Sequence, residues 1–326
     1  MLAGMALKVR WHRARVAADK PASKPNLVMG ANVQVCWEKF CRYWDVEPRM
    51  VKLDGATHLT AAQAAAACDE NTIGVVAVLG STFDGSYEPV AEMAKALDAL
   101  QAATGLDVPL HVDAASGGFI APFIDEDLVW DFRLDRVRSI NASGHKYGLV
   151  YPGVGWILWR SQMDLPEELV FSVDYLGGSM PTFALNFSRP AAQVIAQYYT
   201  LVRYGFDGYR RIQQQSRDIA MHIADGVDKL GPFTLMSRGA ELPVLAFSLS
   251  DASNGFTVYD ISHELRSYGW IVPAYPMPEG MEGVDVLRVV VRNGFTFDLA
   301  NMFLTDLAKS VDRLSGAAAK RVAFHH

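Results

Sequence analysis

The segment Thr72–Leu79, with the sequence TIGVVAVL, constrains the fold of this chain more than any other. It has the length of a strand and carries apolar, mostly β-branched residues at successive positions, so both of its faces must be buried. A strand buried on both faces is typical of a parallel sheet that is covered by helices. We therefore expect an α/β fold. The same run is far too short to cross a membrane.

Strands and helices alternate along the first half of the chain, which favours the same fold class. Further strands are expected at Asn26–Met29, Arg49–Leu53, Val108–Val112, Arg136–Asn141 and Gly155–Trp159. Helices are expected at Met1–Val16, Val33–Trp44, Thr60–Cys68 and Tyr87–Ala103. Thr60 is a plausible N-cap for its helix, whereas the first helix has no Ser, Thr, Asp or Asn to cap it.

A change of pattern near Gly205 indicates a second domain. Residues 160–188 are rich in loop-forming residues, and Pro190 is expected to open a helix that runs to Tyr204. Beyond it, helices and strands follow at Tyr209–Leu230, Phe233–Met236, Val244–Leu249, Val258–Tyr268, Val286–Val291 and Asp298–Leu314. We predict a large domain over residues 1–204 and a smaller C-terminal α+β domain over residues 205–326.

Composition excludes several classes of function. With 30 Lys+Arg and 36 Asp+Glu in 326 residues, the formal net charge is −6, which argues against nucleic acid or a membrane surface as partner. The three cysteines are too few for a disulfide framework, and reduced thiols in the cytoplasm are expected. The eight histidines show no metal-ligand spacing, so no metal site is expected. Glycine-rich nucleotide fingerprints are absent, which disfavours a nicotinamide oxidoreductase.

The segment His111–Phe119 (HVDAASGGF) is the first candidate for chemistry. A strand brings Asp113 to its carboxyl end, which is the edge where α/β proteins bind ligands. The small residues that follow would let a planar ligand approach the backbone. On this segment alone, an ordinary turn capped by aspartate explains the pattern better.

The segment Ser139–Tyr147 (SINASGHKY) is the second candidate. Lys146 follows a buried strand among small residues, where partial desolvation makes an amine nucleophilic. A surface lysine in a loop is the alternative. Taken together, however, a lysine and the Asp113 carboxylate at neighbouring strand ends match the needs of pyridoxal phosphate: a Schiff-base amine and a partner for the ring nitrogen. The hydroxyl of Ser143 could hold the phosphate.

On these residues the chain resembles the group II pyridoxal-phosphate-dependent decarboxylases and, among them, the glutamate decarboxylases of bacteria and plants. The resemblance runs essentially from Met1 to His326. Its motifs are PNLV (25–28), VQVCWEKF (33–40), RYWDVE (42–47), CDENTIGVV (68–76), HVDAASGGF (111–119), VWDFR (129–133), SGHKY (143–147), VDYLGG (173–178), NFSRP (186–190) and VIAQYY (194–199). It implies the large domain of a type I pyridoxal-phosphate transferase fold, with a mainly parallel sheet.

The resemblance also implies roles in binding the cofactor. Lys146 would form the Schiff base, and Asp113 would pair with the ring nitrogen. Ala115 and Gln34 would cover the two faces of the ring. Ser143 would bind the phosphate.

Further roles concern the substrate and a neighbouring subunit. Thr82 would lie near the ring hydroxyl or the substrate carboxylate, and Arg288 would bind a substrate carboxylate. His145 matches a phosphate-binding and active-site position. Ser188 would reach the phosphate of the adjacent subunit, which makes a dimer the minimum unit of a homo-oligomer. The tail Phe324-His325-His326 is weakly similar to one that closes the site at neutral pH.

The activity implied by the resemblance is decarboxylation of L-glutamate to γ-aminobutyrate and carbon dioxide. A proton would return to the α-carbon from Lys146 or through His145. Each turnover consumes a proton, so a role in acid tolerance is a reasonable hypothesis. Two glycosylation sequons, at Asn141 and Asn186, contain the two proposed phosphate-binding serines, which favours a cytoplasmic location.

The resemblance also implies a segment before the residue that matches Met1, with a Gly-Ser-Ser-Glu-Ala motif that binds phosphate and residues that recognise the distal carboxylate of glutamate. Two hypotheses remain open at this point. Met1 is either a misplaced start or a fragment boundary of a glutamate decarboxylase. Alternatively, the chain is a truncated, catalytically impaired pseudoenzyme or a partner subunit of a full-length paralogue.

Overall fold

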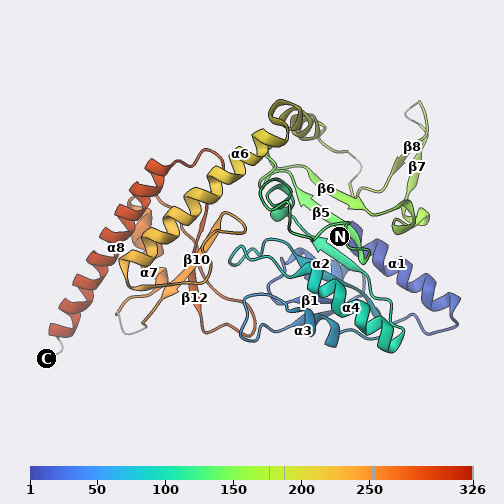
Figure 1. Ribbon diagram of the computed structural model, residues 1–326, viewed down its shortest axis with the longest axis horizontal. Coiled ribbons are helices and arrows are strands. Elements are labelled where there is room, and N and C mark those ends of the chain that lie inside the picture. Colours follow the sequence, from blue (N-terminus) through green and yellow to red (C-terminus); the bar gives the residue numbers. More distant parts are fainter. Residues whose placement is uncertain (176, 187, 252–254, 325–326) are drawn as a thin grey trace. The chain divides into compact units, whose positions relative to one another are not determined.

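A computed structural model describes residues 1–175, 177–186, 188–251 and 255–324 (Figure 1). The chain divides into two compact units. Unit 1 comprises Met1–Leu79 and Tyr87–Arg203, and unit 2 comprises Gly80–Ser86 and Tyr204–His326. The predicted α/β fold with a mainly parallel sheet is confirmed, and the structure adds a smaller antiparallel sheet.

Unit 1 is built on a six-stranded sheet in the order β2-β1-β3-β4-β5-β6. The strands are β1 (Asn26–Gly30), β2 (Glu47–Val51), β3 (Thr72–Val78), β4 (Leu110–Asp113), β5 (Val137–Ser143) and β6 (Gly155–Trp159). All neighbouring pairs are parallel except β5 and β6, which are antiparallel. Every residue of β3 is buried, as the apolar run Thr72–Leu79 predicts. The carboxyl ends of β1, β3, β4 and β5 therefore share one edge of the sheet.

The helices of unit 1 come from the segments between its strands. They are α1 (Leu2–Ala17), α2 (Cys36–Tyr43), α3 (Ala61–Ala66), α4 (Val90–Thr104) and α5 (Ala121–Ile124), with short 3₁₀ helices at Gly117–Phe119, Gln162–Asp164 and Glu167–Leu169. A core cluster joins α1 and α2 to the sheet through residues such as Leu7, Phe40, Leu27 and Val76. The side chain of Thr60 caps α3, as the sequence predicts, and the structure adds a capping box with Gln63.

The first helix has no side-chain cap, in agreement with the sequence, but its amphipathic character is weak. Its buried residues are confined to the first two turns, between Ala3 and Leu7. The rest of α1 is exposed or half-buried; Trp11 packs there against the core cluster, and Arg10 pairs with the buried carboxylate of Asp164. The helix is thus attached to unit 1 by its beginning rather than along a full apolar face.

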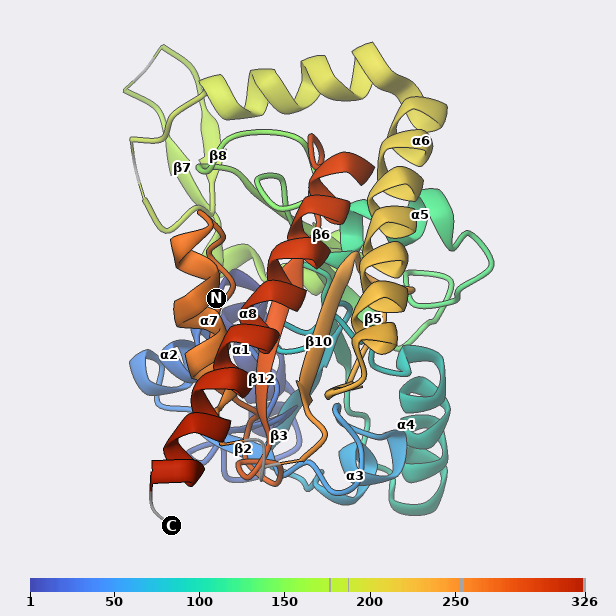
Figure 2. The ribbon, with the colours of Figure 1, turned by 90° about the vertical axis from the view of Figure 1, so that its left-hand side faces the viewer.

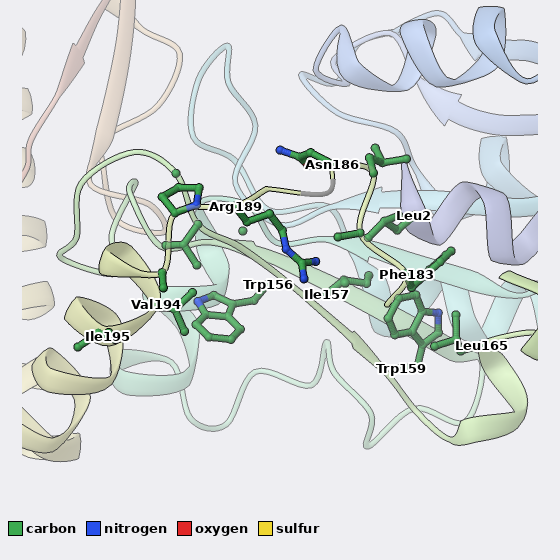
Figure 3. A pocket seen from close by; sticks show the side chains of 17 residues that line it. Leu2, Trp156, Ile157, Trp159, Leu165, Phe183, Asn186, Arg189, Val194 and Ile195 are labelled. Atoms are coloured by element: carbon green, nitrogen blue, oxygen red, sulfur yellow. The ribbon is translucent and has the colours of Figure 1, made fainter. Parts of the chain in front are cut away.

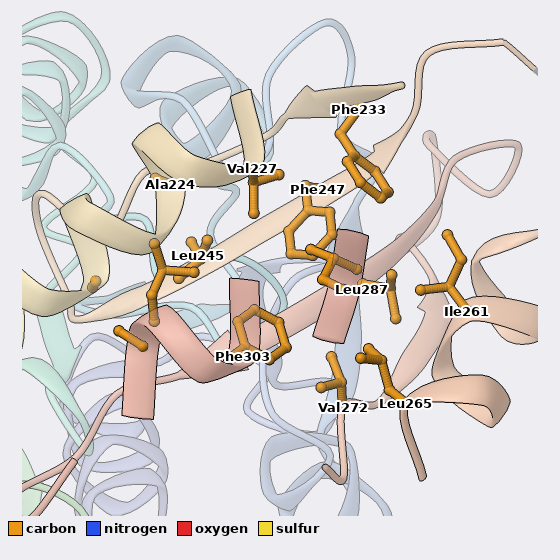
Figure 4. Packing of buried hydrophobic residues seen from close by; sticks show 14 of the residues in the cluster. Ala224, Val227, Phe233, Leu245, Phe247, Ile261, Leu265, Val272, Leu287 and Phe303 are labelled. Atoms are coloured by element: carbon orange, nitrogen blue, oxygen red, sulfur yellow. The ribbon is translucent and has the colours of Figure 1, made fainter. Parts of the chain in front are cut away.

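Unit 2 contains a four-stranded antiparallel sheet in the order β11-β12-β10-β9. The strands are β9 (Phe233–Leu235), β10 (Val244–Leu249), β11 (Ala274–Pro276) and β12 (Asp285–Val290). Three helices pack on one face of this sheet: the second part of α6 (Ala192–Leu230), α7 (Val258–Ser267) and α8 (Phe297–Phe324) (Figure 2). Figure 4 shows their contacts with the sheet, in which Phe303 and Leu265 approach Phe247 and Leu287.

The other face of this sheet is covered by the segment 80–86, which we call the inserted loop. Alternate strand residues Ala246 and Val286 point to this face, where Phe83 packs against their cluster. Ser237 Oγ donates a hydrogen bond to the backbone oxygen of Asp84, at 2.5 Å. At Gly85 the backbone has a positive φ of +84°, and a Cβ atom there would lie 2.8 Å from Val244. Both the backbone conformation and the close approach therefore require glycine. The inserted loop is thereby an integral part of unit 2.

Some element boundaries differ from the sequence expectation. The second helix begins at Cys36 rather than Val33, because the side-chain oxygen of Gln34 accepts a hydrogen bond from the Cys36 amide and so ends the preceding turn. The short strands β7 (Phe171–Val173) and β8 (Met180–Thr182) lie in a segment expected to be loop, and β11 was also missed. Three-residue strands are too short for periodicity to identify. Gly205 interrupts α6, with φ +58° and ψ −169°.

Within the described ranges, no helix has the length and apolarity needed to cross a membrane. Over the same residues, no group of three or more His, Cys, Asp or Glu side chains is arranged to hold a metal ion. The three cysteines are free, and burial raises the pKa of the Cys41 and Cys68 thiols to about 12. Of the proposed closing tail, His325 and His326 lie outside the described residues.

Candidate active site

Asp113 is the last residue of β4 and lies at the carboxyl edge of the parallel sheet. Its side chain is buried, with an exposed fraction of 7%. Oδ2 accepts a hydrogen bond from the indole Nε1 of Trp37, at 2.7 Å. Oδ1 accepts from the amide of Asn141, at 2.9 Å, and from the backbone NH of Ala115, at 3.2 Å. Among the described residues, three donors face the two oxygens of this carboxyl group.

Lys146 lies in the turn that follows the neighbouring strand β5. Its Nζ donates a hydrogen bond to the Ser116 hydroxyl at 3.2 Å, and Ser116 is three residues beyond Asp113. The two segments are also joined through the backbone, because the Ser143 NH donates to the Ala115 carbonyl at 3.1 Å. The structure therefore brings the carboxylate and the amine to the same edge, as the sequence predicts from the two strand ends.

The other residues predicted to bind the cofactor in unit 1 belong to the segments that carry Asp113, Lys146 and Trp37 or lie next to them. Ala115 and Ser143 are half-buried and are connected by the backbone hydrogen bond just described. His145 is half-buried in the same turn as Lys146. Gln34 precedes α2, which also carries Trp37; its side chain is exposed and its Oε1 accepts from the Cys36 amide at 2.6 Å. To cover a ring, the Gln34 side chain would have to give up that contact.

Thr82 and Arg288 lie together in unit 2. Thr82 belongs to the inserted loop, and its backbone oxygen accepts a hydrogen bond from Arg288 Nη1. The guanidinium lies 5.5 Å from the centre of the Tyr275 ring, in a cation–π arrangement. Tyr275 in turn donates its hydroxyl to the Phe83 carbonyl, and burial raises the pKa of that hydroxyl to about 12. The two residues predicted to bind a substrate carboxylate are thus in direct contact, although 206 positions separate them in sequence.

Ser188 lies in a different environment, on an exposed segment of unit 1. It lines a cavity of about 500 Å³ together with Arg189 and the strands β7 and β8. A neighbouring cavity of about 730 Å³ is lined by Trp156, Val194 and other apolar residues, and the Arg189 side chain extends into it (Figure 3). No contact of Ser188 with the Asp113 edge is recorded among the described residues.

A second buried carboxyl group lies at the same edge of the sheet. Glu88 accepts hydrogen bonds from the backbone NH of Val78 (2.7 Å) and of Leu59 (3.1 Å) and from the amide of Asn32 (2.9 Å). Burial raises the pKa of Glu88 to about 7, with the hydrogen bonds opposing that shift. Glu88 connects the end of β3 to the segments before α3 and after β1, so its role is to hold the edge together.

Sequence reasoning missed Trp37, Asn141 and Ser116. Asn141 could have been found, because β5 is predicted as a buried strand and a buried asparagine there needs polar partners. Ser116 stood within the HVDAASGGF motif, but nothing in the sequence tied it to Lys146. Trp37 gave no signal, since a tryptophan in an apolar helix face is usually only part of the core.

The residues present fit pyridoxal phosphate by the chemistry of their donors and acceptors. The Asp113 carboxylate has about four acceptor positions, and the protein fills three, which leaves room for one ring NH. Lys146 supplies an amine, and Ser116 and Ser143 supply hydroxyls. Ala115, whose backbone NH donates to the carboxylate, carries only a methyl side chain, which a planar ring can approach closely.

Comparison with known proteins gives a consistent result. Residues 1–250 match the family model described as the pyridoxal-dependent decarboxylase conserved domain. A glutamate decarboxylase of Solanum lycopersicum is 52% identical over 315 residues, and one of Aliivibrio fischeri is 50% identical over 315 residues. The solved structure of a Lactobacillus brevis glutamate decarboxylase matches with a TM-score of 0.92 at 46% identity.

The matches differ in how much of each protein they cover. They include 96% of this chain in all three cases. They include 62% of the tomato protein, 68% of the Aliivibrio protein and 72% of the Lactobacillus chain. The chain therefore spans less than two thirds of the tomato relative.

Proposed function

The chain belongs to the pyridoxal-dependent decarboxylase family, and we propose that it converts L-glutamate to γ-aminobutyrate and carbon dioxide with pyridoxal phosphate as cofactor. One observation carries the proposal: a buried carboxylate with three donors and a lysine amine meet at the carboxyl edge of a parallel sheet. The identity of about 50% to glutamate decarboxylases supports the choice of substrate.

Bound pyridoxal phosphate would supply an electron-accepting ring that stabilises the charge left when carbon dioxide departs. Asp113 would bind the ring nitrogen and hold a proton there through its remaining acceptor position. Lys146 Nζ would bind the cofactor covalently through its aldehyde carbon. Lys146, or His145 in the same turn, would return a proton to the substrate α-carbon. Ser143 would bind the phosphate, while Ala115 and Gln34 would orient the ring.

Arg288 and Thr82 would bind a carboxylate of the substrate. A guanidinium presents several N–H donors in a fixed geometry that suits a carboxylate. In Arg288, the donor Nη1 is used by the Thr82 backbone oxygen. The Tyr275 ring holds the guanidinium from one side. Because Thr82 is part of unit 2, the two groups would act as one binding element.

The direct test is to add pyridoxal phosphate to the purified 326-residue chain and measure absorbance, covalent attachment after borohydride reduction, and formation of γ-aminobutyrate from glutamate. We expect all three signals, and the first two must depend on Lys146. Attachment at a different lysine, or a chain that takes up no cofactor, would overturn the proposal.

We further propose a homodimer as the minimum active unit. Part of unit 1, residues 151–175, 177–186 and 188–203, exposes many large apolar side chains, and we call it the outer segment. The exposed fractions of Tyr175, Tyr198 and Val202 are 81%, 70% and 67%. Apolar surface on this scale marks an interaction site in most proteins. Ser188 lies within the outer segment, which is consistent with a contact to the phosphate of a second copy.

A cytoplasmic location is part of the proposal. Asn141 belongs to a glycosylation sequon, but its amide nitrogen donates to Asp113. A glycan on that nitrogen would remove the contact and block the edge of the sheet. The hypothesis of an impaired chain or partner subunit is less well supported, because Asp113, Lys146 and their contacts are all retained.

A further inference from the structure

Four polar side chains lie at alternate positions of two neighbouring strands of unit 1, β4 and β5. His111 and Asp113 lie on β4, and Ser139 and Asn141 lie on β5. The register pairs His111 with Ser139 and Asp113 with Asn141. Alternate residues of a strand share a face, so the four side chains project from the same face of the sheet. His111 is completely buried, and Ser139 is exposed by only 2%.

The hydrogen bonds between these side chains have a fixed direction. A carboxylate only accepts, so the amide nitrogen of Asn141 must face Asp113, at 2.9 Å. The amide oxygen of Asn141 then faces His111 Nε2, at 2.7 Å, and this ring nitrogen must carry the hydrogen. The other ring nitrogen, Nδ1, accepts from the Ser139 hydroxyl at 2.8 Å. Each bond thus determines the orientation of the next.

The surroundings keep His111 neutral. Burial lowers the pKa of His111 to about 4, and this outweighs the opposing effect of the Asp113 charge. The Trp37 ring lies 5.0 Å from the imidazole, and the indole NH donates to Asp113 Oδ2. Trp37 therefore encloses the same polar group from the side of α2.

We propose that Ser139, His111 and Asn141 form a positioning relay that orients the Asp113 carboxylate for the ring nitrogen of the cofactor. The relay holds Oδ1 through the amide nitrogen of Asn141, whose amide oxygen is held in turn by His111 Nε2, while Trp37 holds Oδ2. The carboxylate then keeps one acceptor position for a ring NH. None of the three relay residues acts on the substrate; each acts through Asp113. The inference rests on the proposed role of Asp113.

The first test needs no cofactor. In the chain labelled with ¹⁵N-histidine, the ring nitrogens of His111 are assigned by their loss in His111→Gln. We expect the neutral form with hydrogen on Nε2 between pH 5.5 and 8. Asn141→Ala should mix the two neutral forms, because it removes the acceptor at Nε2, whereas Ser139→Ala should keep the single form, because the Asn141 amide oxygen still accepts from Nε2. A hydrogen on Nδ1 in the unsubstituted chain would overturn the relay.

The second test measures cofactor binding in Asn141→Ala, with Thr72→Val as the matched control. Thr72 also makes a buried hydrogen bond in this sheet, to Asn26, but at the opposite end of β3. Losing a hydrogen bond to a charged group predicts a decrease of about 10- to 100-fold in affinity for pyridoxal phosphate in Asn141→Ala. The ¹⁵N shift of the cofactor ring nitrogen should also move. The control should leave both quantities unchanged.

The outcomes separate the relay from the proposed function. If Asn141→Ala and Thr72→Val bind the cofactor equally and show the same ring-nitrogen shift, the relay is refuted while the cofactor site stands. If the unsubstituted chain binds no cofactor, the proposed function fails. In that case the state of His111 in the cofactor-free chain still decides whether the hydrogen-bonded arrangement exists.

Discussion

The Asp113 edge and the outer segment belong to the same unit but are built in opposite ways. At the Asp113 edge, polar groups are buried and every recorded contact of the carboxylate comes from within the unit. In the outer segment, large apolar side chains such as Tyr175 and Val202 face outward. In the first region the carboxylate finds its three donors within one chain. The second region exposes apolar surface of the kind that marks interaction sites.

Replacing Lys146 should have the largest effect on the Asp113 edge. Lys146→Ala removes the amine next to Ser116, so covalent attachment of pyridoxal phosphate should be abolished. The measurement is protein-bound cofactor after borohydride reduction and denaturation. Lys95→Ala, at an exposed position of α4, is the control and should retain full attachment. Attachment that survives in Lys146→Ala would refute the assigned role.

Asp113→Asn should have the next largest effect. An asparagine presents one acceptor and one donor, so it cannot accept from both Trp37 and Asn141 as the carboxylate does. It also cannot hold a proton on the ring nitrogen by charge. We expect a decrease in turnover of about 10²-fold or more, with some cofactor still bound. The variant Asp107→Asn, at an exposed carboxylate, should be unaffected. Near-normal turnover in Asp113→Asn would contradict the site.

Charged substitutions in the outer segment should weaken self-association of the chain. Tyr198 and Val202 are four residues apart on α6, so their exposed side chains lie on one face of the helix. The double substitution Tyr198→Glu with Val202→Glu should weaken self-association by about 100-fold or more, because it places charges in an apolar interface. Sedimentation across a concentration series measures this.

The control for self-association is Lys95→Glu, which makes the net charge more negative by the same amount at a position outside the outer segment. It should leave the mass of the assembly unchanged. The state of His111 should be the same in the double variant as in the unsubstituted chain, because the two regions are independent. A monomeric unsubstituted chain, or a double variant of unchanged mass, would rule out this surface as the interface.

The smallest effect is expected in the pH dependence of stability. His111 has its pKa lowered to about 4, so its contribution is present above pH 6.5 and is lost as pH falls toward 4. Glu88 has its pKa raised to about 7, so its contribution is present below pH 4.5 and is lost as pH rises toward 7. Each amounts to about 3 kcal/mol, and between pH 4.5 and 6.5 the two oppose one another.

Two substitutions separate these contributions. In His111→Gln, Glu88 is the one of the two groups that still titrates, so the free energy of unfolding should fall as pH rises from 4.5 to 6.5. In Glu88→Gln, His111 is the one that still titrates, so the free energy of unfolding should rise over the same range. Urea unfolding followed by tryptophan fluorescence measures both slopes. Equal slopes in the two variants would show that one of the buried groups does not titrate as described.

The sequence could predict those features that depend on neighbouring residues. The strand β3, the N-cap at Thr60, and the positions of Asp113 and Lys146 at the ends of their strands all follow from local pattern. The relay could not be predicted, because the pairing of His111 with Ser139 depends on the register of two strands 28 residues apart. The contact of Thr82 with Arg288 depends on packing over a still longer separation.

Domain organisation also depends on contacts between residues that are distant in sequence. A division of the sequence near residue 204 follows the change of pattern along the chain, but patterns along a chain do not reveal segments that pack elsewhere. The inserted loop covers the face of the second sheet that carries Ala246 and Val286. Its residues are not unusual in composition, and only three-dimensional contacts assign them to unit 2.

The inserted loop has a consequence for synthesis of the protein. Thr82 leaves the ribosome 206 residues before Arg288, its partner in unit 2. At typical rates of translation, the loop must wait roughly 10–40 s for the strands that it will cover. During that time unit 1 can complete its sheet around the gap between Leu79 and Tyr87. The last part of the chain then folds onto a segment that was made early. Folding of unit 2 therefore depends on a loop whose two ends are already held by unit 1.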